Sequence, residues 1–95
     1  MGGHMDVTHH PHDTHGEFAL EESGKRLGRM TYSRQSDLVS ILHTEVDPSL
    51  RGQGAGERLV TAAVEWAREE GHRVLPICPY AKAVFARHPE YGDVL

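Results

Sequence analysis

Three glycines within five residues form the clearest chemical feature of this 95-residue chain. They belong to a glycine turn that consists of Arg51, Gly52, Gln53, Gly54, Ala55 and Gly56. Glycines let the backbone approach a ligand closely, and the start of a helix offers unpaired N–H groups with a partial positive charge. A diphosphate needs several such donors that converge. We therefore predict that the backbone N–H groups from Gln53 to Glu57 bind a pyrophosphate, with Arg51 adding positive charge or ordering the turn.

The spacing of the glycine turn excludes two other phosphate-binding motifs. A Walker A loop ends in Gly-Lys-Ser/Thr, but here Gly56 is followed by Glu57 and Arg58. The dinucleotide fingerprint G-x-G-x-x-G fails as well, because its third glycine position, counted from Gly52, falls on Glu57. A turn without any ligand is the remaining alternative. Three glycines in five residues are a poor choice for stability alone, so we interpret the turn as a binding site.

Cys78, the only cysteine, is the first candidate for covalent chemistry. Pro79 suits the first position of a helix, which predicts Cys78 as the N-cap. At that position the helix dipole can lower the pKa of a thiol and favour the nucleophilic thiolate. A free cysteine is also often a small buried apolar residue. The sequence leaves both roles for Cys78 open.

Candidates for general acid–base catalysis come from one strand and from the C-terminal region. His43 and Glu45 lie on one face of a predicted strand. Each is a candidate general base, and the alternative is a solvent-facing residue without a catalytic role. Tyr80 and Tyr91 are candidates for donating a proton to a leaving group, with packing as the alternative. His88 precedes a proline and is predicted to close a helix end by hydrogen bonding.

Hydrophobic periodicity predicts the elements that position these residues. Alternating apolar residues, separated by short turns, predict an antiparallel meander of three strands. An amphipathic helix is predicted after the glycine turn and ends before Gly71. A short strand that is parallel to residues 38–46 follows it, and after that strand comes a second helix. The fold class is therefore α/β (α+β-like), with a mixed sheet and two helices. The predicted strands are residues 16–21, 27–34, 38–46 and 73–77. The first predicted helix begins at residue 54 or 56 and ends at residue 70, and the second begins at residue 79 and ends at residue 88.

The N-terminal region is predicted to lie outside the domain. We interpret residues 1–4 as a tag remnant and the His-rich stretch up to residue 15 as a flexible arm. A surface metal site is the alternative, but the histidines lack cysteine partners and match no known ligand spacing, so no metal is predicted. Residues 16–95 are predicted to form a single domain.

Composition narrows the possible partners. The net charge is −4 and basic residues form no cluster, so neither nucleic acid nor an anionic membrane surface is expected as a partner. No apolar run approaches the roughly 18 residues that span a bilayer, and no secretory signal is recognisable. A single cysteine is consistent with a reducing, cytoplasmic location. The oligomeric state is left open.

Four segments in order resemble the GCN5-related N-acetyltransferase superfamily. The pattern Arg51-x-x-Gly54-x-Gly56 matches its Q/R-x-x-G-x-G/A signature. Together with residues 43–46, 76–80 and 88–91, it is similar to the small, single-domain acetyltransferase-like subfamily, over residues 18–91. The resemblance implies a reduced form of that superfamily's fold, with acetyl-coenzyme A as cosubstrate and an amine as acceptor.

In that superfamily the strands before the glycine turn and after the helix splay apart, and the acetyl-pantetheine arm enters the gap. Carried over by position, Thr44, Glu45 and Val46 line this arm, with Cys78 beside the acetyl group. Larger members carry additional N-terminal helices that help to build the acceptor pocket, whereas this sequence passes directly from strand to strand. Two hypotheses follow: an N-acetyltransferase acting directly or through Cys78, and a non-catalytic acetyl-coenzyme A-binding module or sensor.

Overall fold

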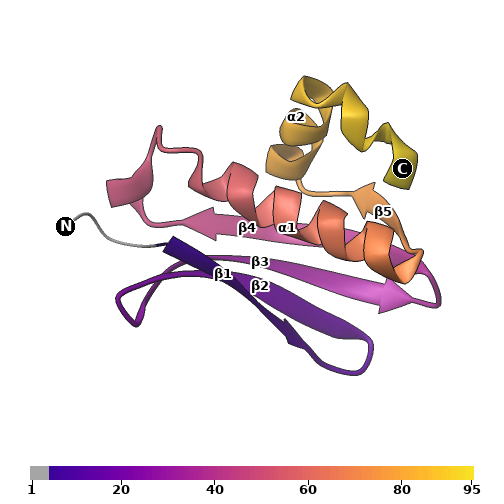
Figure 1. The fold of residues 1–95 in the computed structure, drawn as a ribbon, viewed down its shortest axis with the longest axis horizontal. Helices are drawn as coiled ribbons and strands as arrows, with labels where there is room; N and C mark the ends of the chain where they lie inside the picture. Colours follow the sequence, from indigo (N-terminus) through magenta and orange to yellow (C-terminus); the bar gives the residue numbers. More distant parts are fainter. Residues whose placement is uncertain (1–4) are drawn as a thin grey trace.

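A five-stranded mixed sheet forms one layer, and the helices cover one of its faces (Figure 1). The computed structural model describes residues 5–95. Strands follow one another in the order β1-β2-β3-β4-β5, antiparallel except for the parallel pair of β4 and β5. The strands are β1 (Met5–Pro11), β2 (His15–Glu22), β3 (Lys25–Gln35), β4 (Leu38–Val46) and β5 (Arg73–Pro76). The helices are α1 (Ala55–Glu70) and α2 (Pro79–Arg87), with the 3₁₀ helices η1 (Pro48–Leu50) and η2 (Pro89–Val94).

Two tight turns confirm the predicted meander. The registers Glu22↔Lys25 and Gln35↔Leu38 leave only two residues in each turn. Such turns need a positive φ, which Gly24 provides at 77° in the first of them. The α/β fold with a mixed sheet is as predicted.

The prediction of a flexible arm was wrong for the described part of the His-rich stretch. Met5–Pro11 forms β1, which pairs with β2 along its whole length. The imidazole of His9 stacks on Phe18 at 4.1 Å between ring centroids, and its Nε2 lies 2.6 Å from the hydroxyl of Tyr32. These aromatic contacts anchor β1, so the antiparallel part of the sheet has four strands and begins before residue 16. The predicted tag remnant, residues 1–4, lies outside the described residues.

The amphipathic stripe of α1 packs against the sheet as predicted. Its buried apolar residues include Leu59, Val60, Ala63, Val64 and Ala67. The helix ends at Gly71, whose φ of 72° is the left-handed conformation expected of a C-terminal glycine. Trp66 of the same helix packs against the rings of His9 and His72. Within residues 5–95, neither helix is long and apolar enough to cross a membrane.

Candidate functional site

The two parallel strands separate halfway along β4. Pairing with β5 extends only from Leu38 to Ile41, while β4 continues to Val46. The carbonyl of Ile41 then accepts hydrogen bonds from the N–H groups of both Ile77 and Cys78, at 3.1 and 3.0 Å. Beyond this point the edge of β4 that faces β5 is left without a pairing strand, among the residues described. This divergence of the two strands, called the gap below, agrees with the splay that the resemblance implies.

A bulge at Leu42 changes which side chains of β4 face the helices. Ile41 pairs with Tyr32 and His43 with Thr31, so Leu42 is an extra residue without a partner in the register. Before the bulge Ile41 is buried, and after it His43 and Glu45 are exposed while Thr44 is half-buried. Thr44 therefore faces the helices and the gap. His43 and Glu45 face the open side of the sheet.

The glycine turn presents bare backbone at the start of α1. Gly52 and Gly54 have φ values of 80° and 71°, and a Cβ at either position would meet no atom within 4 Å. Gly54 is the N-cap of α1 and no side chain caps the helix. In the described structure, the N–H groups from Gly54 to Glu57 have no acceptor. Four donors thus point out of the first turn.

One of the predicted donors is already engaged. The N–H of Gln53 donates to the carbonyl of Leu50 at 3.1 Å, and the Gln53 side chain donates to the carbonyl of Ser49 at the same distance. Gln53 therefore holds the turn against η1. Its N–H is already bonded, contrary to the prediction that it donates to the pyrophosphate. The sequence could not reveal this, because the acceptor appears only once η1 forms.

A cavity of about 210 Å³ opens at the start of α1, and Gly54, Ala55 and Gly56, three of the four residues with free N–H groups, line it. Its wall is made by Val46, Asp47, Pro48, Leu50, Arg51, Gly52, Gly54, Ala55, Gly56 and Tyr80. Tyr80 forms one side, and its ring lies so close to Gly56 that an added Cβ there would be 2.5 Å from Cζ and Oη. Asp47 has a lowered pKa because it accepts hydrogen bonds from Ser49, and it thereby caps η1. The glycine turn therefore borders this cavity together with Val46, the last residue of β4.

Cys78 and Thr44 meet across the gap. Cys78 is the N-cap of α2 as predicted, and its thiol donates a hydrogen bond to Oγ1 of Thr44 at 3.7 Å. Burial raises the pKa of the Cys78 thiol. Once the thiol is deprotonated, its sulfur can instead accept hydrogen bonds, first from the backbone of Ala81 and then from the Thr44 hydroxyl, and the net direction of the pKa is downward. The site therefore favours the thiolate more than an ordinary cysteine does.

The structure does not bring the predicted bases to this sulfur. The Glu45 side chain is 74% exposed and lies 3.9 Å from Arg29 on the open side of the sheet. His43 lies on the same side. Their roles as bases stay predictions. So does the role of Tyr80 as a proton donor, although its ring does line the cavity.

Tyr91 is not placed for proton transfer at the cavity. Its ring is buried, and its hydroxyl lies 2.7 Å from Oγ1 of Thr61 on α1. The contact holds η2 against the long helix. Arg68 of α1 also contacts η2 through a bidentate ion pair with Asp93, at 2.8 and 2.9 Å.

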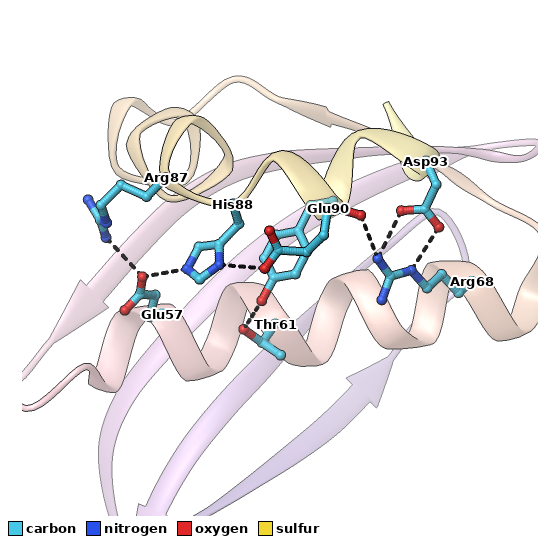
Figure 2. Close-up of polar contacts among 8 residues, drawn as sticks. Glu57, Thr61, Arg68, Arg87, His88, Glu90 and Asp93 are labelled. Carbon is cyan, nitrogen blue, oxygen red and sulfur yellow. Dashed lines mark hydrogen bonds and ion pairs between the residues drawn. The ribbon is translucent and has the colours of Figure 1, made fainter.

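A polar cluster at the first turn of α1 is the feature that sequence reasoning missed. Figure 2 shows Arg87 and His88, at the end of α2, pointing toward Glu57. His88 lies 2.8 Å from Glu57 and 2.9 Å from Glu90, and Arg87 donates to Glu57 at 3.3 Å. These groups come from three elements and are up to 33 positions apart in the sequence (90 − 57). The only available signal was the acidic residue directly after the glycine turn.

Comparison with known proteins identifies the family of this chain. A family model described as GCN5-related N-acetyl-transferase matches residues 17–94. The chain belongs to this family. A GCN5-like protein of Staphylococcus aureus has a known structure with a TM-score of 0.71 and 28% identity, over 94% of this chain and 85% of that one.

Two further relatives show how far the likeness extends. An uncharacterised N-acetyltransferase of Methanocaldococcus jannaschii is 29% identical over 72 residues, which are 68% of this chain. The match covers only 32% of that protein, so the chain spans about a third of its length. An aminoglycoside N-acetyltransferase in complex with coenzyme A has a TM-score of 0.69 at 19% identity, covering 97% of this chain and 89% of that one. At this identity the likeness is one of fold.

Proposed function

We infer that this protein binds acetyl-coenzyme A and transfers the acetyl group to an amine. The observation that carries this function is the row of free N–H groups from Gly54 to Glu57, next to the 210 Å³ cavity that Gly54, Ala55 and Gly56 line. Such a row, at the positive end of a helix dipole, is suited to a diphosphate. Family membership supports the same ligand.

The remainder of the coenzyme has a matching path. A pantetheine arm contains amide groups that need hydrogen-bonding partners, and the unpaired edge of β4 at Thr44–Val46 supplies backbone groups next to the cavity. Following this edge from the glycine turn leads into the gap where Thr44 and Cys78 meet. We place the thioester there. Arg51, exposed at the rim, adds positive charge near the phosphates.

Two routes of transfer are compatible with this placement. In direct transfer, the amine nitrogen attacks the thioester carbon, the C–S bond breaks, and a base takes the proton of the amine while the thiolate leaves. In the covalent route, the Cys78 thiolate attacks the thioester carbon and displaces the coenzyme A thiolate. The amine nitrogen then attacks the acetyl carbon on Sγ, the C–Sγ bond breaks to return the Cys78 thiolate, and a base takes the proton of the amine. His43 or Glu45 is proposed as the base, and Tyr80 as the proton donor to the departing thiolate.

A binding module or sensor is the second candidate. It is favoured by one observation, the position of His43 and Glu45 on the opposite side of the sheet from Cys78. An acceptor amine would have to reach the thioester through the gap between β4 and β5 for either base to act.

Intact mass spectrometry with acetyl-coenzyme A separates these possibilities. A gain of one acetyl group that disappears in Cys78→Ala supports the covalent route. Release of free thiol only when an amine is supplied, and also in Cys78→Ala, supports direct transfer. Binding with neither outcome supports the module. The turn itself is tested by Gly54→Val and Gly56→Val in calorimetry with coenzyme A, where unchanged affinity of a folded variant would exclude the turn from the site.

A further inference from the structure

The first turn of α1 contains a negative charge at the point where an anionic ligand would bind. Glu57 is the only acidic residue of that turn, directly after Gly56, and its backbone N–H is one of the four free donors. A carboxylate there stabilises the helix through its dipole, but it also repels a diphosphate. The surroundings of this carboxylate therefore affect the affinity of the site.

His88 is held between two carboxylates. Its Nε2 lies 2.8 Å from Oε1 of Glu57 and its Nδ1 lies 2.9 Å from Oε2 of Glu90 (Figure 2). A carboxylate only accepts hydrogen bonds, and a neutral imidazole has a single N–H to donate. Both contacts can be hydrogen bonds only when the ring is protonated. The arrangement is thus built for an imidazolium.

Charged and titratable groups from three elements surround this ring. From α1 come Glu57, and Arg68 beside Glu90; from α2 comes Arg87, which donates to Glu57 at 3.3 Å. From η2 come Glu90 and Tyr91, whose ring stacks on the imidazole at 4.7 Å. Hydrogen bonds to Glu57, and next to Glu90, raise the pKa of His88 above its ordinary value. Arg87 stays charged at all relevant pH values, so the imidazole is the group that changes.

We propose that His88, supported by Arg87, neutralises the Glu57 carboxylate in its protonated form, and thereby makes the affinity for the coenzyme diphosphate depend on pH. This inference rests on the proposed function. At low pH the imidazolium cancels the charge of Glu57 and the diphosphate binds well. As the pH rises through the pKa of His88, the imidazolium is lost, Glu57 is only partly compensated by Arg87, and affinity falls. Because binding and protonation are linked, a bound diphosphate must in turn raise the pKa of His88.

Calorimetry with dephospho-coenzyme A tests this proposal, because that ligand keeps the diphosphate and lacks the terminal phosphate that titrates in the same range. Between about pH 6 and pH 8.5, wild-type affinity is expected to fall roughly three- to tenfold, as for a unit charge screened by solvent. Glu57→Gln should bind at the alkaline end as tightly as the wild type does at the acidic end. His88→Asn should bind weakly throughout. Asp93→Asn, which removes an α1–η2 contact three turns away, should keep the wild-type slope.

A measurement on the unmodified protein complements these variants. Saturating dephospho-coenzyme A should raise the pKa of His88 in an NMR titration of the ring. The proton affinity of the ring should increase by the same factor by which the ligand affinity falls when the imidazolium is lost. An affinity that is constant over this range, or a slope that persists in Glu57→Gln, would overturn the inference and leave the proposed function intact. Absence of binding by the wild type at every pH would overturn both.

Discussion

The contact between Gly56 and Tyr80 offers a sharp test of how the cavity is built. A Cβ added at Gly56 would lie 2.5 Å from both Cζ and Oη of Tyr80, closer than two such atoms can approach. The conformation of Gly56 itself is helical and would accept alanine. The substitution Gly56→Ala therefore puts one methyl group in conflict with one ring, without backbone strain.

Two opposing effects set the magnitude. Alanine in place of glycine within a helix raises the free energy of unfolding by up to about 0.5–1 kcal/mol. Displacement of the Tyr80 ring loses part of its packing, which costs roughly 1 kcal/mol because the ring is already 40% exposed and can rotate outward. For Gly56→Ala alone we expect a change in unfolding free energy of less than about 1 kcal/mol. In a Tyr80→Ala background, the same substitution should stabilise the protein by about 0.5 kcal/mol or more.

Urea unfolding of the four proteins in this double-mutant cycle measures the coupling. We expect an interaction energy of about 1 kcal/mol between the two positions, above the few tenths seen for independent sites. If the two substitutions are additive within about 0.3 kcal/mol, the ring does not rest on Gly56 and the described wall of the cavity is incorrect.

Three further substitutions test other parts of the account. Gly54→Ala should lower the unfolding free energy by about 1–2 kcal/mol in urea denaturation, because φ at this N-cap is 71°; an unchanged midpoint would contradict that conformation. Tyr91→Phe should cost about 1 kcal/mol through loss of the 2.7 Å contact to Thr61, with wild-type affinity for coenzyme A in calorimetry, and weaker binding would place Tyr91 at the site after all. The pKa of His9 is lowered, by burial first and by His10 second, so protonation favours the unfolded state and stability should be lost as the pH falls below about 6.5. His9→Phe should weaken this acid destabilisation in urea midpoints measured across that range, and an identical pH dependence would show that His9 does not anchor β1.

Local patterns in the sequence were sufficient to predict the glycine turn, the long helix and the antiparallel meander. Gly54 and Gly71 require positive φ values that few other residues accept, and the spacing from Leu59 to Ala67 permits only one buried helix face. Cys78 before Pro79 likewise identified the start of α2. Each of these inferences depends on neighbours within a few positions along the chain.

Features that depend on distant residues were not predictable. A histidine-rich strand looks solvated until Phe18 and Tyr32 supply the aromatic surface on which His9 packs. The bulge at Leu42 lies in an apolar run with no glycine to mark it. The contact of Glu57 with His88 joins residues 31 positions apart, after α2 and η2 have docked on α1. Tertiary packing decides all three.

The most direct test of the central claim is NMR detection of the backbone amides during a coenzyme A titration. We expect large downfield shifts of the amide protons of Gly54, Ala55, Gly56 and Glu57, because these four donors have no acceptor in the described structure. Pantetheine, which lacks the diphosphate, should leave them nearly unshifted, and Gln53 should respond least in the turn because its N–H already bonds Leu50. Saturating coenzyme A that leaves all four amides unmoved would contradict a diphosphate site at the start of α1.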